Sequence, residues 1–410
     1  MQNSTMGIAA GDATARRRHP GLAVTAVAFA FWITMAGTTA PTPLYPLYGE
    51  AFGFSPFTVT VVFAVYAIGV VAGLLLFGRL SDQIGRRPTL VTATVLSVAA
   101  AAIFLVTQNV AVLLVARMVS GLSAALVTGA ATAALTELIG PNARVRPATV
   151  ALFANMGGLA CGTLLAGILA DLVPEPLRTP WAVLGALAVL GLLGVATVQE
   201  SAVHRSGFTL RLQPLHIPGE IRAVFLRTAM AAGAGFAVLG VLTAVTGLFL
   251  GTLLHQSSHT LTGLVVFIAF ACTALGQLLL RVLNAAVALP AACVGLIVAA
   301  GLIAVALATT WLIPLLIGAA VNGLATGVAL GQGIATITSR GAPRYRGASV
   351  STFFAILYTM LAVPAIGVGV LIRASSLRSA GEIFSAAVAV LALAVLLSLI
   401  GTKTGRGDAP

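Results

Sequence analysis

The sequence contains very little charge. Only 8% of its 410 residues are Asp, Glu, Lys or Arg, whereas about 25% is usual for a soluble domain. Hydrophobic residues make up 59% of the chain, and its mean hydropathy is +1.07. Because so few polar groups cannot cover a surface in water, this composition excludes an ordinary soluble globular protein and indicates that lipid surrounds the chain.

Residues that build catalytic, metal or nucleotide sites are also scarce. The cysteines lie inside apolar runs without the spacing of metal ligands, so we interpret Cys161, Cys272 and Cys293 as small buried apolar side chains. The nucleotide-binding pattern G-x-x-x-x-G-K-S/T is absent, and no grouping of His, Cys and Asp suggests nucleophilic or acid–base chemistry. We therefore expect no cofactor, no metal and no enzymatic activity.

The formal net charge of +12 would favour nucleic-acid binding in a soluble protein. Here the basic residues are scattered over short connections, whereas nucleic-acid binding requires a basic patch or stripe. We therefore expect membrane lipid as a partner and no nucleic acid. The excess of Arg is typical of a membrane protein that keeps its basic residues on the cytoplasmic side.

What the sequence does contain is a series of long apolar runs. A membrane-spanning helix needs about 20 apolar residues. We predict twelve spans, at Leu22–Tyr45, Pro56–Leu80, Leu90–Val106, Val110–Leu135, Ala148–Asp171, Pro180–Val198, Ala223–Thr252, Leu261–Leu280, Val287–Ala308, Trp311–Thr338, Ser349–Arg373 and Glu382–Ile400. The first run is too long for a signal-peptide core, so we interpret it as an uncleaved span.

The longest polar connection, Gln199–Arg222, separates six spans from six. We therefore predict an all-α membrane protein with 12 transmembrane helices in two pseudo-symmetric six-helix bundles. The expected divisions are residues 1–198 and 223–410, joined by a cytoplasmic linker at 199–222. The chain also repeats itself: RPATVALF at Arg146–Phe153 matches RGASVSTF at Arg346–Phe353, 200 residues later. Two similar halves suit a transporter that rocks one half against the other.

The basic residues predict which side of the membrane each connection faces. With the N-terminus in the cytoplasm, 18 of them fall in cytoplasmic segments and three in outer loops, namely Arg178, Arg373 and Arg378. Lys403 is the only lysine, which, with the high Ala and Val content, favours a GC-rich bacterial genome. We expect a multi-pass protein of the bacterial cytoplasmic (inner) membrane with both termini in the cytoplasm, acting as a monomer.

The connection between the second and third spans carries a recognisable motif. Gly78–Leu90 reads GRLSDQIGRRPTL and resembles the signature G-x-L-x-D-x-x-G-R-R-x-x-L of the major facilitator superfamily. The matching positions are Gly78, Leu80, Asp82, Gly85, Arg86, Arg87 and Leu90. The resemblance extends to the whole chain through the span count and the two halves, and it implies secondary transport by alternating access.

The resemblance also implies a latch at the cytoplasmic side. In the family, the motif's aspartate meets the start of the eleventh span when the cytoplasmic side is closed, and its arginines meet an acid at the inner end of the fourth. Asp82 would then pair with Arg346, and Arg86 with Glu137. The alternative is a solvated loop that only fixes topology.

A second motif lies in the fourth span. Leu113–Ala125 reads LLVARMVSGLSAA and resembles the family pattern with Arg and Gly four residues apart, here Arg117 and Gly121. An arginine within a span is costly unless it is paired or lines a cavity. The resemblance implies a role in proton handling or in the substrate path. The alternative is a structural residue that binds carbonyl groups of the first span.

A third motif is less complete. Gly158–Gly167 resembles the antiporter signature G-x-x-x-G-P-x-x-G-G through Gly158, Gly162 and Gly167, with Thr163 in place of proline and Ala166 in place of one glycine. The resemblance implies a drug:proton antiporter, and the two departures weaken that implication. We predict that this small face packs the fifth span against the eighth.

Polar and aromatic residues at mid-depth in the spans are the candidates for cargo binding: Trp32, Thr38, Tyr66, Asn155, Asn322, Gln332, Phe353 and Tyr358. Each has an alternative role in packing helices together. No acidic residue lies deep in a span to carry a proton, and His255 and His259 are expected to be solvated in an outer loop. A mostly apolar site without an acid suits neutral or anionic amphiphiles rather than strongly cationic molecules.

The leading interpretation is a proton-coupled exporter of small organic molecules or drugs, a multidrug efflux antiporter. An uptake carrier or uniporter for a small metabolite or sugar is the alternative, although sugar sites usually contain more amides, carboxylates and aromatics at mid-depth. A non-transporting membrane receptor is a further alternative. The sequence does not identify the cargo.

Overall fold

The computed structural model describes residues 20–140, 143, 145–200, 215–217, 219–342 and 345–404, and within these ranges it is entirely helical apart from turns and loops. Twelve helices are long and apolar enough to cross a membrane, as predicted. The elements are α1 (Pro20–Thr39), η1 (Thr42–Leu44), α2 (Tyr45–Phe52), α3 (Pro56–Phe77), α4 (Leu80–Ile84), α5 (Arg86–Leu105), α6 (Val110–Ile139), α7 (Pro147–Leu172), α8 (Thr179–Ala196), η2 (Gly219–Ile221), α9 (Arg222–Leu253), α10 (His259–Leu279), α11 (Ala285–Thr309), α12 (Leu312–Arg340), α13 (Arg346–Ala374) and α14 (Leu377–Thr404).

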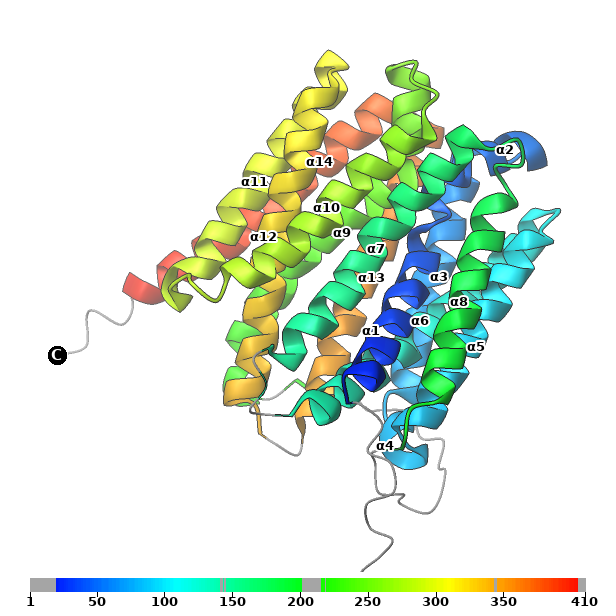
Figure 1. The fold of residues 1–410 in the computed structure, drawn as a ribbon. Helices are drawn as coiled ribbons and strands as arrows, with labels where there is room; N and C mark the ends of the chain where they lie inside the picture. Colours follow the sequence, from blue (N-terminus) through cyan, green and yellow to red (C-terminus); the bar gives the residue numbers. More distant parts are fainter. Residues whose placement is uncertain are drawn as a thin grey trace, which may run out of the picture.

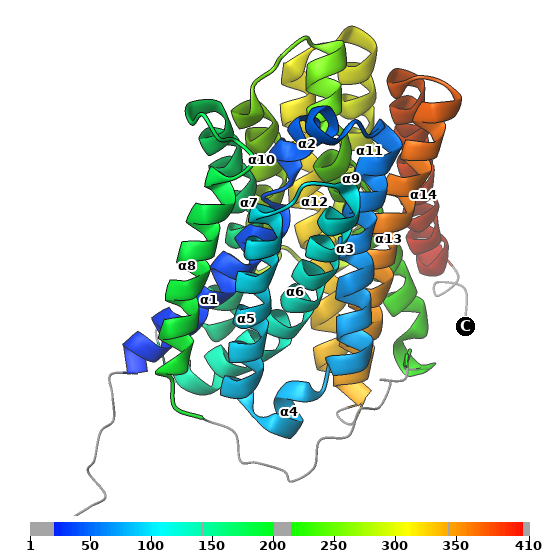
Figure 2. The same ribbon diagram turned by 90° about the vertical axis from the view of Figure 1, so that its right-hand side faces the viewer.

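The helices form two bundles. The first comprises α1, α3 and α5 to α8, and the second comprises α9 to α14, which lie side by side in Figure 1. Most of the predicted linker, at 201–214 and 218, lies outside the described residues, so its boundaries remain a prediction. Figures 1 and 2 place α4 at one end of the molecule and α2 at the other, and these are called the α4 end and the α2 end below.

The first predicted span is interrupted near its end. α1 stops at Thr39 and is followed by η1, which begins after Pro41 and contains Pro43. Proline has no backbone N–H and its ring clashes with the preceding turn, so a regular helix cannot continue through this segment. Elsewhere, local capping fixes the helix starts: the side chains of Asn109 and Ser258 accept hydrogen bonds from the first turns of α6 and α10.

Two helix pairs make the most extensive contacts between the bundles, α3 with α13 and α7 with α10. Small residues allow the close approach in both pairs. Gly369 of α13 faces Thr60 of α3, and Gly263 of α10 faces the carbonyl of Thr163 in α7, with no room for a further methyl group at either glycine. In a membrane, where lipid is as apolar as the side chains, such packing is the main force that holds helices together.

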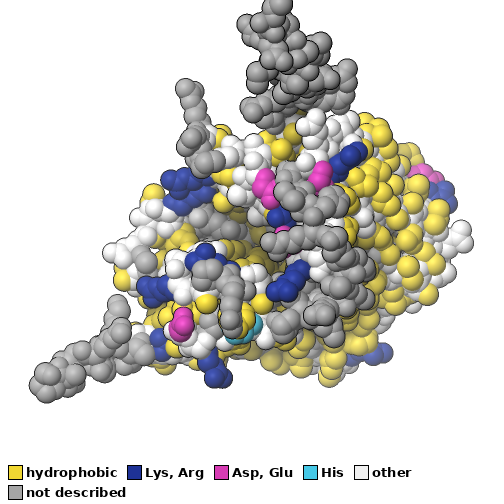
Figure 3. Space-filling view, turned by 90° about the horizontal axis from the view of Figure 1, so that it is seen from below, with side chains coloured by type: hydrophobic (Ala, Val, Ile, Leu, Met, Phe, Trp, Pro, Cys, Tyr) yellow, Lys and Arg dark blue, Asp and Glu magenta, His cyan; other side chains and the backbone are white. Residues whose placement is uncertain are grey.

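Basic side chains gather at the α4 end. Figure 3 views the molecule from this end and shows several Lys and Arg side chains around the face, with few acidic ones. Such a distribution is typical of a cytoplasmic face. The orientation of the termini in the membrane remains a prediction.

Candidate functional site

A network of charged side chains organises the α4 end of the first bundle. Gly85 has a φ of 106°, which allows the tight turn between α4 and α5. Arg86 follows it and donates from Nε to Glu137 Oε1 at 3.0 Å and from a terminal nitrogen to Asp82 Oδ1 at 2.5 Å. The guanidinium therefore ties α4 and α5 to the end of α6 with two ion pairs.

Glu200, which sequence reasoning missed, completes this network. Its carboxylate accepts the backbone N–H groups of Arg86 and Arg87, both at 2.9 Å. A carboxylate is well placed there because the first N–H groups of a helix have no partner within it and carry partial positive charge. Arg87 adds a bond of 2.5 Å to the carbonyl of Ala196. The only sequence signal was that an acid directly follows the sixth apolar run.

The predicted pairing of Asp82 with Arg346 does not form in this structure. Asp82 pairs with Arg86 instead, and its side chain is 66% exposed. Arg346, at the start of α13, donates to the carbonyl of Gly341 at 3.1 Å. Asp82 and Arg346 belong to different bundles, and each is satisfied within its own. Of the predicted latch, the contact of Arg86 with Glu137 within the first bundle is present, and the contact of Asp82 with Arg346 between the bundles is absent.

At the α2 end, by contrast, a carboxylate joins the two bundles. Asp171, at the end of α7, accepts the backbone N–H groups of His259 and Thr260 at 2.9 and 2.8 Å and the hydroxyl of Ser258 at 2.9 Å. His259 Nδ1 lies 2.8 Å from Asp171 Oδ1. We call these four residues the α7–α10 clamp. The expectation of a solvated His259 was wrong, because its side chain is only 18% exposed.

The antiporter-like glycines are divided between two neighbours. Only Gly167 faces α10, at the carbonyl of His259. Gly158 and Gly162 instead face α1, at the carbonyls of Trp32 and Ala36, where a side chain would overlap the backbone. The prediction that the whole small face packs on the eighth span was therefore correct for one of its three glycines. The others hold the fifth span against the first.

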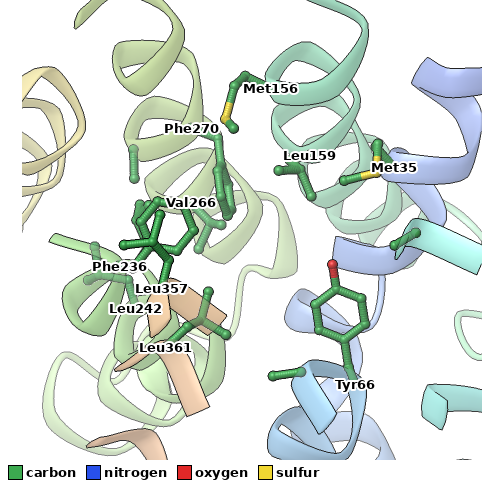
Figure 4. Packing of buried hydrophobic residues seen from close by; sticks show 14 of the residues in the cluster. Met35, Tyr66, Met156, Leu159, Phe236, Leu242, Val266, Phe270, Leu357 and Leu361 are labelled. Atoms are coloured by element: carbon green, nitrogen blue, oxygen red, sulfur yellow. The ribbon is translucent and has the colours of Figure 1, made fainter. Parts of the chain in front are cut away.

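Between the bundles lies the central cavity. It is lined by residues of both halves: Thr38, Thr39, Phe63, Tyr66, Val70, Leu74, Ala125, Thr128, Asn155, Met156, Leu159, Phe236, Leu239, Thr243, Phe270, Phe354, Tyr358 and Leu361. Figure 4 shows Tyr66 and Leu159 across from Phe236 and Phe270. The cavity volume is about 50 Å³, far below the roughly 300–1,000 Å³ of a typical ligand site, so cargo must widen it.

Four of the eight predicted cargo residues line this cavity: Thr38, Tyr66, Asn155 and Tyr358. Tyr66 of α3 and Tyr358 of α13 meet across the interface of the bundles, edge to face, with ring centroids 6.4 Å apart. Oδ1 of Asn155 is buried and has no hydrogen-bond partner among the described residues. A role of these four in binding stays a prediction.

The other four lie away from the cavity. Asn322 donates to the carbonyl of Gly235 at 3.3 Å within the second bundle, and Phe353 packs edge to face on Phe225. Trp32 stacks on Phe29, and Gln332 is half-buried on α12. Helix position alone could not separate these side chains from those that face the partner bundle.

Arg117 is buried, with 1% of the residue exposed. It donates from a terminal nitrogen to the carbonyl of Thr38 at 2.6 Å and from Nε to that of Val62 at 3.3 Å. Its guanidinium lies 4.6 Å from the ring centroid of Tyr66, a cation–π contact. The bond to Thr38 agrees with the structural alternative, and the bond to Val62 in α3 adds a contact that the alternative did not include. Gly121, one turn later, permits this approach of α6 to α3 because it faces the Tyr66 carbonyl.

The family model of the Major Facilitator Superfamily matches residues 27–367. The chain belongs to the major facilitator superfamily. This match accounts for the motif at Gly78–Leu90 and for the two six-helix bundles, and it shows a membrane transporter fold.

Relatives within the superfamily are similar over parts of the chain. The inner membrane transport protein YnfM of Escherichia coli is 26% identical over 175 residues, which cover 43% of this chain and 42% of that protein. The arabinose-proton symporter of Bacillus subtilis is 33% identical over 95 residues, which cover 23% of this chain and 20% of that protein. The chain thus aligns with less than half the length of either relative.

Solved structures resemble the whole fold. A mutant of the nucleoside transporter NupG gives a TM-score of 0.72 at 13% identity and covers 92% of this chain and 99% of its own. A bacterial homologue of the human lysosomal transporter Spinster, in an inward-facing and unoccupied conformation, gives 0.68 at 16% identity and covers 94% and 96%. At such identities the similarity shows the superfamily's fold alone.

Proposed function

We propose that this transporter exports small organic molecules or drugs across the bacterial cytoplasmic membrane by alternating access, in exchange for protons. The observation that carries the proposal is the central cavity, which lies between the two bundles and is lined by side chains of both. A site at the interface of two rocking halves is the arrangement that alternating access requires.

The contacts at the two ends support a switch between two states. In the structure the α7–α10 clamp joins the halves at the α2 end, while Asp82 and Arg346 remain apart at the α4 end. We propose that the second state reverses this pattern, with the clamp released and the Asp82–Arg346 pair formed. Gly167, at the clamp, belongs to the antiporter-like motif that favours export.

Proton coupling has one structural candidate among the described residues. No charged residue lines the central cavity, so a proton cannot compete with cargo for a carboxylate there. Asp171 is a carboxylate whose hydrogen bonds join the two halves. Because these donors stabilise the charged carboxylate, Asp171 binds a proton only weakly while the clamp is closed. Asp171 would therefore take up a proton after the clamp has opened, and the neutral acid would then oppose closure.

Uptake is the second candidate, and a specific observation favours it. The relative from Bacillus subtilis is a symporter of arabinose and protons, and such a protein carries both in the same direction. Against it, the cavity has a single amide among the described residues, and its four threonine hydroxyls already donate to backbone carbonyls.

Transport in proteoliposomes distinguishes these functions. The purified protein is reconstituted with a pH-sensitive dye inside, a proton gradient is imposed, and a panel of aromatic drugs, nucleosides and pentoses is offered. Cargo efflux coupled to proton entry supports the proposal. Co-transport of a pentose with protons supports uptake, and the absence of transport for the whole panel contradicts both.

A further inference from the structure

We propose that the central cavity selects uncharged, mainly aromatic molecules that donate one hydrogen bond to Asn155. This inference deepens the proposed function and rests on it for its physiological meaning. The binding preference itself follows from the lining of the cavity and can be tested separately from transport.

The wall of the cavity is aromatic on both sides. Six rings contribute to it: Phe63, Tyr66, Phe236, Phe270, Phe354 and Tyr358. Tyr358 packs edge to face against Tyr66 on one side and Phe236 on the other, with centroids 6.4 and 6.2 Å apart. Flat aromatic molecules pack favourably in such a frame by stacking and edge-to-face contacts.

The threonine hydroxyl groups of the cavity already donate to backbone carbonyls. Thr38 and Thr39 donate to the carbonyls of Met35 and Leu159, at 2.7 and 2.8 Å. Thr128 and Thr243 likewise donate to carbonyls of their own helices. Their protons are therefore not available to a cargo. The four threonines thus contribute no free hydrogen-bond donor to the wall.

Asn155 is different, because its Oδ1 is buried with no partner among the described residues and the residue lines the cavity. A buried acceptor without a hydrogen bond is costly. A cargo hydroxyl or N–H that reaches this oxygen removes that cost, whereas a cargo without a donor does not. Asn155 is thus one polar group of the wall that orients the cargo.

Charge is disfavoured in both signs. A cation would find no carboxylate among the described lining residues, and the face of Tyr66 is occupied by the guanidinium of Arg117, 4.6 Å away. An anion would not reach Arg117, which is not part of the wall and is bound to the carbonyls of Thr38 and Val62. An unpaired charge in a dry cavity loses its hydration without compensation.

Matched probes on one skeleton test the inference by equilibrium binding. The probes are 2-naphthylmethanol, its methyl ether, 2-naphthylmethylammonium and 2-naphthoate, with the same four groups on biphenyl and indole. Binding is measured by calorimetry to the protein in nanodiscs, with empty nanodiscs as reference. The alcohol of at least one skeleton should bind tenfold or more tighter than its ammonium and carboxylate counterparts, and several-fold tighter than its ether.

Two variants assign the preference to Asn155. Asn155→Leu should bind alcohol and ether equally, and Asn155→Asp should prefer the ammonium. The control is Thr359→Val, since Thr359 follows Tyr358 but is exposed and outside the cavity. Each variant must elute from size-exclusion chromatography as folded, monodisperse protein. If neither Asn155 variant does so, the order of affinities measured for the wild-type protein decides the inference.

Three results would overturn the inference: a wild-type protein that binds the ammonium or the carboxylate as tightly as the alcohol, folded Asn155→Leu protein that keeps the alcohol preference, or no binding by any uncharged probe. A protein that shows the expected ranking but transports nothing would contradict the proposed function and leave the binding preference intact.

Discussion

Asp171 at the end of α7 accepts the backbone N–H of His259, the first residue of α10, at 2.9 Å. These two helices belong to different bundles, so the bond joins the two bundles at the α2 end. With Ser258 and Thr260 as further donors, the carboxylate also occupies the N-terminus of α10, where negative charge is stabilised. No comparable bond joins Asp82 to Arg346 at the other end.

Neutralising Asp171 should loosen this closure. Hydrogen bonds to a charged group contribute about 1.5–3 kcal/mol each, and Asn keeps some of them, so Asp171→Asn should favour the open state by about 1–3 kcal/mol. In a protein without native cysteines, Thr243→Cys in the cavity should react several-fold faster with a maleimide added from the α2 side. Glu175→Gln, at an exposed acid three residues beyond α7, should leave the rate unchanged. Equal rates in all three proteins would refute the role of the clamp.

Asp82→Asn should cut transport without affecting insertion or folding. Asp82 is exposed in its pair with Arg86, and pairs exposed to solvent contribute only about 0–1 kcal/mol to stability, so the thermal midpoint should hardly change. Transport should fall because the state that pairs Asp82 with Arg346 loses its ion pair. Normal transport rates in this variant would rule out the latch and leave Asp82 as a residue that fixes topology.

Glu200→Ala should destabilise the first bundle. The change leaves the N–H groups of Arg86 and Arg87 without their acceptor, and the loss of a helix cap costs about 0.5–2 kcal/mol. A lower thermal midpoint is expected. Glu220→Ala, at an exposed acid in η2, is the matched control and should melt like the wild type. If both variants melt alike, Glu200 does not cap α5.

Gly162→Leu should prevent the packing of α7 on α1, because a side chain there would overlap the carbonyl of Ala36. Overpacking of this kind costs about 1–3 kcal/mol or more. Reduced expression and a lower thermal midpoint in detergent are expected. Gly301→Leu is the control, since nothing lies within 4 Å of a side chain added at that position. A well-folded Gly162→Leu protein would show that α1 and α7 separate without loss.

The fold could be predicted from the sequence because each membrane span is recognisable from its length and hydropathy. The loop at Gly78–Leu90 added a motif that is specific to the superfamily. The Arg86–Glu137 pair was also predicted, because the resemblance to the superfamily implies that the motif's arginines meet an acid at the inner end of the fourth span. What could not be predicted was which state of the transporter the structure represents, and therefore whether Asp82 meets Arg346.

The predictions that were wrong or incomplete concern features that depend on how a helix is rotated about its axis or on contacts between residues far apart in the sequence. Asn155 and Asn322 look alike in sequence, yet only Asn155 lines the cavity, because the two helices present different faces to the partner bundle. His259 was taken for a loop residue because its partner, Asp171, lies 88 residues away in the sequence. Glu200 was overlooked because its bonds are to backbone N–H groups, which no side-chain pattern indicates.

The central claim is that the two halves rock about the central cavity. Spin-label distances measure this directly, in lipid nanodiscs and a protein without native cysteines. One label pair spans the α2 end, at the exposed residues Gln108 and Thr309, and another spans the α4 end, at Thr136 and Ser339. Introducing Asp171→Asn should lengthen the Gln108–Thr309 distance and shorten the Thr136–Ser339 distance. Distances that stay fixed, or that change in the same direction at both ends, would contradict alternating access.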